Sequence, residues 1–535
     1  MEKIWAILQT LMVLFPHRIN APRIDGQLHL NEILAPFYHG VASGDPFSDS
    51  VIIWTRVTLS NDVTDLSNSK SGTNTSLTVE WEMSSDTSFE IIVASGKSET
   101  DSSNDFTVKI EVDGLSFNTY YYYRFSYDGD VSITGRTKTA PAANETSQIR
   151  FATVSCADYQ SGYFNAYDRI TERNDIDAVI HLGDYLYEPG NSEGVVRDHE
   201  PPWELAELAD YRTRYSQYRL DESLRNLHQQ YPFIVTWDDH EFANNAYLEG
   251  AQNHESETEG DWSTRLDNAV KAYNEWMPMR LRDPNNDQKI YRSFKYGDLV
   301  DLFMLDTRII GRDKQLDFID GINPEAYNDP DRQLLGTEQM EWLQNGLRNS
   351  TAQWKIIAQQ VMVSPFRAFG FIRLNMDAWD GYGSERARLL DFIEKNNIEN
   401  IVILTGDIHS SWAMDVPLGS KPYNPITGEN SLAVEFITTS ITSPGLDKSI
   451  FALFLNQFVK VNNPHMKYVK LSGKGYSILD ITSERTQNDF YYVGSVRSKN
   501  TDHNYGASYF TRDKQNRVRK GESASSSSVE IPDLA

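Results

Sequence analysis

Cysteine is nearly absent from this sequence. Cys156 is the only one among 535 residues, so no disulfide can form within the chain. Stability must therefore come from packing, and a hydrophobic content of 39% is sufficient for sizeable cores. A chain of this length has room for two or more domains.

Long apolar runs are also scarce. The clearest, residues 4–15, follows Lys3 and is too short for a membrane-spanning helix. It resembles the core of a signal peptide, although no small-residue cleavage site follows it. We therefore expect residues 1–35 to be a leader segment with a weak export signal, and we expect no membrane span.

Basic residues are fewer than acidic ones. Asp and Glu number 76 against 50 Lys and Arg, which gives a formal net charge of -26. Such a surface repels nucleic acids and anionic membranes and attracts cations. The composition therefore excludes nucleic-acid binding other than as a substrate, and suits a secreted or salt-adapted protein that we expect to be monomeric.

Residues 36–140 read as β-structure throughout. About seven short apolar segments are separated by polar turns, such as 61–74, a spacing typical of a β-sandwich. Gly114-Leu115, followed by four tyrosines at 120–123, matches the corner of fibronectin-type sandwiches, where a Tyr hydroxyl bonds nearby backbone. We predict a fibronectin-like or immunoglobulin-like β-sandwich domain over 36–140.

The pattern changes after residue 147. Strands and helices alternate to about residue 405, and the remainder is strand-rich, which predicts layered sheets with flanking helices in a catalytic domain over 147–500. The segment 501–535 is assigned to a C-terminal region whose Ser-rich part, from about 523, we predict to be disordered. The predicted helices are 164–173, 205–218, 222–230, 266–276, 337–349 and 385–396.

Polar residues gather after four predicted strands, 149–155, 178–182, 233–237 and 401–405. Ligands bind at the carboxyl ends of strands in open α/β sheets. Several buried carboxylates would repel one another without cations, and carboxylates suit Ca²⁺ and iron. The sequence therefore predicts a metal cluster. Its candidates are Cys156, Asp184, Tyr187, Asp239, His240, Asp407 and His409.

Two of these residues suggest particular roles. Asp184 follows a strand and the Gly183 turn, so it is placed to bridge two ions. His240 follows Asp239 directly and could lie over a substrate as a general acid without ligating metal. Each motif alone is ordinary, because Gly-Asp after a strand is usually only a turn. The recurrence at four strand ends is what indicates a site.

The order of these motifs resembles the calcineurin-like metallophosphoesterases, with their Gly-Asp, Gly-Asn-His and Gly-His-x-His blocks. Cys156, Asp239 and Asp407 depart from that pattern in the way that PhoD-like alkaline phosphatases do. The likeness runs from about residue 36 to about residue 495. Further motifs that carry it lie at 41–46, 53–56, 210–215, 236–245, 305–308 and 379–382.

The resemblance implies a layered metallophosphoesterase core that uses Fe³⁺ and Ca²⁺. Cys156 and Tyr187 would ligate iron, and Asp184 would bridge iron and calcium. Asp239 and Asp407 would hold calcium, and His409 would complete the cluster. Asn244 or Asn245 would supply a further calcium ligand, with Asn244 also a candidate for substrate binding. Arg212 and Arg214 are candidate phosphate clamps.

The resemblance also implies an activity. We expect an alkaline phosphatase that hydrolyses small phosphate esters through a metal-activated oxygen nucleophile, with Asp184 and His240 as catalytic residues. No Ser nucleophile-elbow motif supports a covalent route. A phosphodiesterase or phospholipase D-like hydrolase, and a non-catalytic binding module, remain as alternatives.

The resemblance also bears on location. Relatives usually carry a twin-arginine export signal, whereas residues 1–25 of this sequence contain no Arg-Arg pair. We nevertheless expect a periplasmic or extracellular location.

Overall fold

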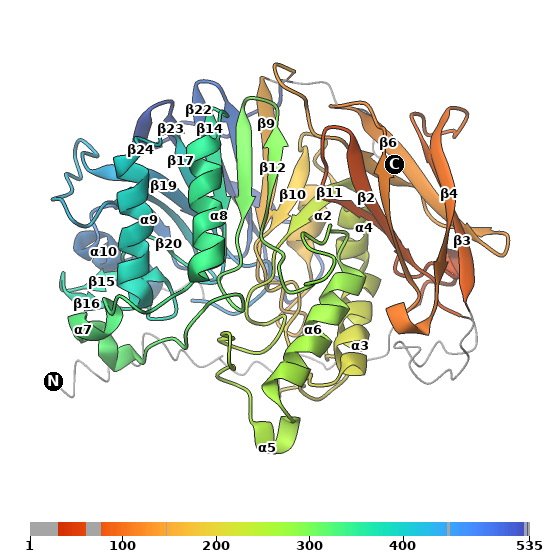
Figure 1. The fold of residues 1–535 in the computed structure, drawn as a ribbon, viewed down its shortest axis with the longest axis horizontal. Helices are drawn as coiled ribbons and strands as arrows, with labels where there is room; N and C mark the ends of the chain where they lie inside the picture. The colour runs from red at the N-terminus through yellow and green to blue at the C-terminus, as the bar shows by residue number, and fades with distance from the viewer. Residues whose placement is uncertain (1–29, 60–75, 146, 447–449, 529–531, 533–534) are drawn as a thin grey trace.

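Two β-sheets face each other across the middle of the protein, and helices cover their outer faces (Figure 1). The structure is a computed structural model and describes residues 30–59, 76–145, 147–446 and 450–528, together with Pro532 and Ala535. The predicted leader at 1–35 lies almost wholly outside these residues, as does the predicted turn at 61–74.

The first sheet has ten strands, in the order β24-β23-β22-β21-β9-β10-β11-β1-β2-β5. Its centre is parallel, because β9, β10, β11 and β1 run the same way, and antiparallel strands extend both flanks. The bounds are β1 Val41–Gly44, β2 Ser50–Arg56, β5 Thr107–Asp113, β9 Gln148–Val154, β10 Ala178–His181, β11 Pro232–Val235, β21 Gly475–Thr482, β22 Arg485–Val493, β23 His503–Arg512 and β24 Gln515–Lys520.

The second sheet has seven strands, in the order β12-β13-β14-β17-β19-β18-β20. Strands β13, β14, β17 and β19 are parallel, and β12, β18 and β20 are antiparallel to their neighbours. The bounds are β12 Arg292–Tyr296, β13 Val300–Met304, β14 Trp354–Ala358, β17 Ile401–Thr405, β18 Ser411–Pro417, β19 Ser431–Ile437 and β20 Met466–Lys470.

Strand alternation explains why the sheets stack. In β17, Val402 and Leu404 enter the core between the two sheets, and Ile401 and Ile403 pack under helices on the outer face. Successive side chains of a strand point to opposite faces, so an unbroken apolar strand can serve both layers. The continuous apolar runs read from the sequence are therefore strands buried on both faces.

Helices on the two outer faces complete the layers. On the ten-stranded sheet they are α2 Asn165–Thr171, α3 Leu208–Leu220, α4 Glu222–Gln230 and α6 Trp262–Trp276. On the seven-stranded sheet they are α8 Gly336–Asn349, α9 Gly383–Lys395 and α10 Ile450–Asn462. The short elements are α5 Ser256–Glu259, α7 Pro324–Tyr327, η1 Glu32–Leu34, η2 Ser102–Asn104, η3 Phe318–Ile322 and η4 Trp379–Tyr382, together with the hairpin β15 Arg367–Ala368 and β16 Ile372–Arg373.

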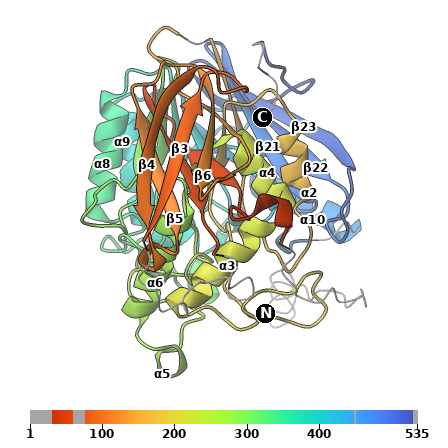
Figure 2. The same cartoon turned by 90° about the vertical axis from the view of Figure 1, so that its right-hand side faces the viewer.

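The N-terminal strands are shared between two sheets. One small sheet holds β4 Ile92–Thr100, β3 Leu77–Ser84, β6 Tyr120–Tyr127, β7 Asp130–Val131 and β8 Gly135–Lys138. It packs on β1, β2 and β5, which belong to the ten-stranded sheet (Figure 2). The 36–140 region is thus joined to the rest by a continuous sheet, and the Tyr121 hydroxyl accepts a hydrogen bond from Ser116 N at 2.8 Å.

The C-terminal third differs from the sequence expectation. The pattern predicted strands without long helices there, whereas α10 occupies residues 450–462. Nine of its thirteen residues are apolar, and Leu453, Phe454 and Val461 among them are exposed, so the polar face by which an amphipathic helix is recognised is interrupted. The ten-stranded sheet also continues past residue 500 through β23 and β24.

The Ser-rich tail is ordered over its described residues, contrary to the predicted disorder. Ser525 N and Oγ donate to Asp489 Oδ2 at 2.8 and 2.5 Å. Gln148 joins the tail from the other side, because its amide nitrogen donates to Ser526 O at 3.0 Å and its oxygen accepts from Ser528 N at 2.8 Å. Polar tail residues thus satisfy buried polar groups of β9 and β22.

Removal of this tail should lower stability. We expect truncation after Gly521 to reduce the midpoint of thermal unfolding by several degrees, because each hydrogen bond lost contributes about 1 kcal/mol. Truncation after Ser528 keeps the contacts to Asp489 and Gln148 and should cost less. Scanning calorimetry of both proteins provides the test, and an unchanged midpoint after the longer deletion would show that the tail contributes nothing.

Candidate metal centre

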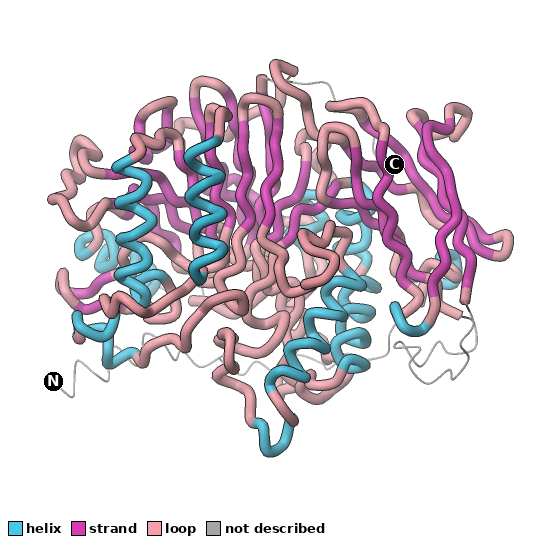
Figure 3. The backbone as a smooth tube through the Cα atoms, in the orientation of Figure 1, coloured by secondary structure: helices cyan, strands magenta, loops and turns pink. Residues whose placement is uncertain are grey.

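Four strand ends meet beneath the stacked sheets. Strands β9, β10 and β11 are neighbours in one sheet, and β17 faces them from the other. Figure 3 shows the loops that follow these strands gathered below the middle of the molecule. Side chains that are far apart in sequence are therefore brought to one place by the common direction of parallel strands.

Gly183 allows two of these loops to touch. A Cβ at this position would lie 2.4 Å from Asp238 N, and the residue has φ +100°, which side chains rarely tolerate. At the equivalent point of β17, a Cβ on Gly406 would lie 3.0 Å from Ser155 Cβ. The glycine of each Gly-Asp pair thus allows two strand ends to approach closely, in addition to allowing the chain to turn.

The residues that follow the strands adopt the left-handed backbone conformation. Their φ values are 60° at Cys156, 54° at Asp184, 60° at Asp407 and 53° at His409. Such values are uncommon outside glycine and cost of order 1–3 kcal/mol, and they concentrate at functional sites. Four residues share this strain beside one another, which marks the strand ends as a site.

Three overlapping groups of side chains could hold metal ions. They are Cys156 with Asp184 and His409, Asp184 with Asp239 and His240, and Asp238 with Asp239 and Asp407. Within each group one ligand atom from every residue lies within 4.8 Å of the others. Because Asp184 and Asp239 each belong to two groups, the groups form one continuous cluster.

The first group is extended by Tyr187. Its hydroxyl donates to Asp184 Oδ2 at 2.8 Å, lies 3.2 Å from His409 Nε2 and accepts from Ser443 Oγ at 2.6 Å. His409 Nδ1 lies 2.6 Å from Pro444 O, so this nitrogen carries the proton and Nε2 presents its lone pair to the group.

The acids of this first group are held in their neutral forms. Burial raises the pKa of the Cys156 thiol well above its usual value, and Asp184 raises it further. Burial followed by Asp184 acts in the same way on the pKa of Tyr187. Bound cations act in the opposite direction, because they favour the thiolate and the phenolate.

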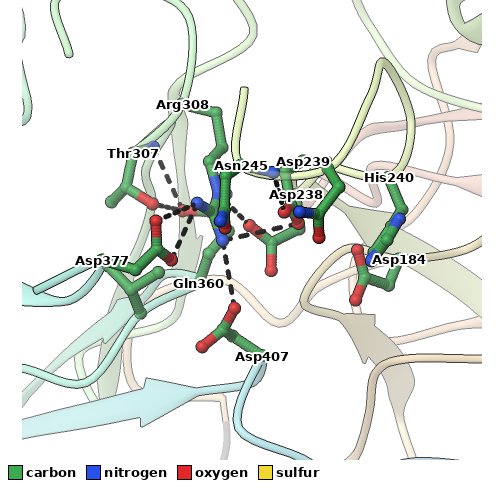
Figure 4. Close-up of polar contacts among 12 residues, drawn as sticks. Asp184, Asp238, Asp239, His240, Asn245, Thr307, Arg308, Gln360, Asp377 and Asp407 are labelled. Carbon is green, nitrogen blue, oxygen red and sulfur yellow. Dashed lines mark hydrogen bonds and ion pairs between the residues drawn. The ribbon is translucent and has the colours of Figure 1, made fainter. Parts of the chain in front are cut away.

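Arg308 lies in the middle of the other carboxylates (Figure 4). Its side chain is fully buried, and it pairs with Asp377 at 3.0 Å, Asp407 at 3.1 Å and Asp239 at 3.4 Å, and more closely with Asp238. A single guanidinium thus contacts four carboxylates, of which Asp377 also pairs with Arg312. Burial raises the pKa of Asp238 and of Asp407 well above the usual value, and Arg308 opposes that shift.

Glu241 ties the loops after β10 and β11 together. Its carboxylate accepts hydrogen bonds from Tyr185 N at 2.6 Å, Asp184 N at 3.0 Å and Asp238 N at 2.7 Å. Burial raises the pKa of Glu241 to about 8, although these backbone donors oppose the shift. The residue therefore sets the spacing of Asp184 and Asp238 without facing the cluster itself.

His240 is oriented by Glu188. His240 Nδ1 lies 2.6 Å from Glu188 Oε2, and its ring packs on Tyr187 with centroids 4.1 Å apart. Burial alone would lower the pKa of His240, but Glu188, Asp239 and Asp184 together raise it well above its ordinary value. The imidazole is thus held protonated beside the cluster.

The two candidate asparagines occupy different positions. Asn245 N donates to Asp239 Oδ2 at 2.6 Å, and Figure 4 shows its side chain beside Asp239. Asn244 N donates instead to Glu188 Oε1 at 2.8 Å. Both side-chain amides also reach Gln252 Oε1, at 3.1 Å from Asn244 and 2.5 Å from Asn245. Asn245 is therefore the one placed against the carboxylates.

Arg212 and Arg214 are not placed as phosphate clamps. Arg212 pairs with Glu275 at 2.5 Å and donates to Ser103 O at 2.8 Å. Arg214 is fully buried and donates to main-chain carbonyls, including Pro201 O at 2.8 Å and the carbonyl of Tyr187. The resemblance and the affinity of Arg for phosphate made both arginines candidates, but neither shows that protein groups already occupy them.

Polar atoms at the cluster lack protein partners. Asp184 Oδ1 and Asp238 Oδ2 are buried without a hydrogen bond among the described residues. Buried polar atoms normally have partners, so these two call for a ligand. Thiol, phenol, imidazole and carboxylate together make a donor set that fits metal ions.

The sequence analysis did not predict several of the residues that line this site, although some of them lie within motifs that it named. Asp238 directly precedes Asp239, and Arg308 belongs to the 305–308 motif. Glu241 lies within the 236–245 motif. Asp377 and Glu188 lie outside these motifs, and an isolated carboxylate looks like a surface residue until its burial is known.

This arrangement, with stacked sheets and a metal-type donor cluster at their strand ends, defines a metallophosphoesterase-like protein. A purple acid phosphatase from yellow lupin shares the fold, with a TM-score of 0.55 at 14% identity over 89% of this chain and 74% of that one. The family model for the PhoD-like phosphatase matches residues 151–490, and the model for the N-terminal domain of PhoD-like phosphatases matches residues 27–141. The chain belongs to the PhoD-like phosphatase family and is a phosphoric ester hydrolase.

Individual relatives agree with this assignment. Alkaline phosphatase D of Bacillus subtilis (strain 168) is 38% identical over 500 residues, which cover 91% of this chain and 82% of that protein. A solved structure of PhoD superposes with a TM-score of 0.83 at 35% identity, over 96% of this chain and 95% of that one. The likeness therefore extends over both the N-terminal and the catalytic parts.

Substitution Gly183→Ala should disrupt the centre. The added methyl would collide with Asp238 N and separate two ligand loops, so we expect phosphatase activity to fall about 10²-fold and metal content to drop. Gly129 has φ +93° and open space around its Cβ position, so Gly129→Ala controls for backbone strain alone. Elemental analysis and p-nitrophenyl phosphate hydrolysis measure both effects; full activity and metal content in Gly183→Ala would contradict the contact.

Proposed function

We propose that this protein is an alkaline phosphatase that hydrolyses phosphate monoesters at the cluster around Asp184. The observation that carries the proposal is the overlap of three ligand groups through Asp184 and Asp239. Two adjacent metal positions that share a carboxylate suit phosphoryl transfer, because charge can be stabilised on both sides of phosphorus.

The donor types divide the cluster into two kinds of metal position. We assign Fe³⁺ to Cys156, Tyr187 and Asp184, with His409 completing the set, because two strongly anionic donors suit a trivalent ion. We assign Ca²⁺ to Asp184, Asp239 and Asp407 with Asn245, since oxygen ligands suit this ion. Bound metal ions would supply the positive charge that stabilises the phosphoryl group and lower the pKa of an attacking water.

His240 has the placement of a proton donor. Glu188 holds its Nδ1, which leaves Nε2 to donate a hydrogen bond toward the site. The surrounding carboxylates keep the ring protonated, and a protonated imidazole can neutralise the alkoxide that leaves phosphorus. Tyr187 supports this geometry by stacking on the ring.

Arg308 has a positioning role in this proposal. Asp239 and Asp407 come from opposite sheets, and the guanidinium joins them at 3.4 and 3.1 Å. Asp377 fixes the other end of Arg308 at 3.0 Å. The arginine thus links Asp239 and Asp407. Although burial opposes the shift, Arg308 and His240 lower the pKa of Asp239 to about 2, whereas burial and Asp238 raise the pKa of Asp407 well above its usual value.

Removal of the shared carboxylate tests the proposal directly. Asp184→Ala should abolish hydrolysis of p-nitrophenyl phosphate and the retention of both metals, because one side chain serves two positions. Chelation of the native enzyme should abolish activity, and adding metal back should restore it. Asp391→Ala, at a partly exposed carboxylate on α9 that pairs with Lys395, is the matched control. Activity that survives chelation with the metals removed would overturn the proposal.

Replacement of His240 separates chemistry from metal binding. We expect His240→Ala to lower turnover by about 10² to 10⁴ while metal content is kept. Glu188→Gln should lower turnover less, since the ring remains but loses its charged partner. His503→Ala, at an exposed strand position, should behave as wild type. Unchanged turnover in His240→Ala would remove the residue from the mechanism.

The iron assignment predicts a visible colour. Iron bound by thiolate and phenolate should give a charge-transfer absorption band, and Cys156→Ser should weaken or shift it. Elemental analysis of the purified protein should find iron and calcium together. A colourless protein that contains zinc alone would contradict this part of the proposal.

The alternatives use the same centre. A phosphodiesterase or phospholipase D-like hydrolase would share these donors, and comparing p-nitrophenyl phosphate with its bis-ester separates it from a monoesterase.

We further propose that the protein is a monomer and is exported to the periplasm or to the outside of the cell, which the acidic composition supports. No helix among the described residues is long and apolar enough to span a membrane. We propose fibronectin-like character for the N-terminal strands on the strength of the Tyr121 hydrogen bond.

A further inference from the structure

An apolar cavity lies directly beside the metal centre. Its volume is about 500 Å³, within the range of small-molecule sites. His409 lines this cavity and also belongs to the ligand group with Cys156 and Asp184, so the two spaces share a wall. The remaining wall comes from α10, from the loop after β16 and from the end of β20, with Leu374, Leu455, Phe458, Val459 and Leu471.

The cavity offers little to a polar ligand. Among the described residues, no Asp, Glu, Lys or Arg lines it. Its polar side chains are engaged with the protein: His409 Nδ1 with Pro444 O at 2.6 Å, and Ser410 Oγ with Ile408 O at 2.9 Å and with Trp412 Nε1 at 2.8 Å. Asn375 Oδ1 accepts from Asp377 N at 3.1 Å. Among the described residues, apolar side chains therefore provide most of the contacts that this cavity offers to a ligand.

We propose that this cavity holds an apolar alkyl or aryl group of the phosphate ester while the phosphate lies at the metal centre. The proposal rests on the proposed function and adds a substrate class to it, namely esters of apolar alcohols. The shared wall at His409 gives the reason, since the cavity begins at a residue of the ligand cluster and a group bonded to phosphorus there lies next to it.

The test is a series of n-alkyl phosphates, from ethyl to octyl, assayed as monomers by release of inorganic phosphate. We expect kcat/KM to rise about threefold to fourfold per methylene until the cavity is filled, because each buried methylene stabilises the complex. Glycerol phosphate serves as the polar reference. Phosphate release without dependence on chain length would overturn the cavity assignment and leave the phosphatase assignment standing, whereas no release from any ester would overturn both.

Variants locate the effect in the cavity. Leu455→Asn introduces a polar group at a buried position of α10 and should abolish the dependence on chain length while glycerol phosphate hydrolysis is kept. Leu453→Asn lies on the same helix at a position 66% exposed and should behave as wild type. Leu374→Asn changes the opposite wall, so it repeats the test without altering the helix. An intact dependence in both Leu455→Asn and Leu374→Asn would contradict the proposal.

Alkyl chains can come from a soluble ester or from a bilayer. Phosphatidic acid in phosphatidylcholine vesicles, compared with monomeric octyl phosphate, distinguishes the sources. Hydrolysis of octyl phosphate alone assigns the cavity to soluble esters. Hydrolysis in vesicles that Leu455→Asn abolishes assigns it to lipids as well, whereas hydrolysis in vesicles that Leu455→Asn leaves unchanged would count against the cavity.

Discussion

Repulsion among buried carboxylates is the constraint on which the rest of this structure depends. Asp184, Asp238, Asp239 and Asp407 lie within one cluster, where burial and then neighbouring carboxylates raise the pKa of Asp184, Asp238 and Asp407. The fold can hold them only with compensating positive charge, which Arg308 supplies within the protein and metal ions would complete. The strained backbone at the strand ends, the close contact at Gly183 and the three bonds to Glu241 all serve to hold these acids together.

The two stacked sheets give this cluster its two sides. One sheet supplies Cys156, Asp184 and Asp239 from adjacent parallel strands, and the other supplies Asp407 and His409. The core between the sheets fixes their separation, so packing far from the site determines the distance between its halves. The same arrangement leaves an apolar cavity behind His409, where α10 covers the end of the second sheet. The cluster and the cavity are thus both consequences of one layer architecture.

Much of the local structure follows from sequence pattern. Strand 401–405 and helix 222–230 coincide with β17 and α4, because an apolar run bounded by glycine and an amphipathic helix with an Asp cap are strong local signals. Helix α10 was missed because apolar residues, such as Leu453 and Phe454, also lie on its exposed side. The tail was misread because composition alone does not reveal that Asp489 and Gln148, which are distant in the chain, form hydrogen bonds with its backbone.

The sequence by itself determined which chemical groups follow the strands, since residue type and strand periodicity are local properties. It named Cys156, Asp184, Asp239, Asp407 and His409 before any coordinates were known, and the structure brings these five into one overlapping cluster. Only the tertiary structure decided which charged groups face that cluster. Arg308 enters it while Arg212 and Arg214 bind Glu275 and main-chain carbonyls, because burial and partner choice depend on contacts between segments distant in the chain.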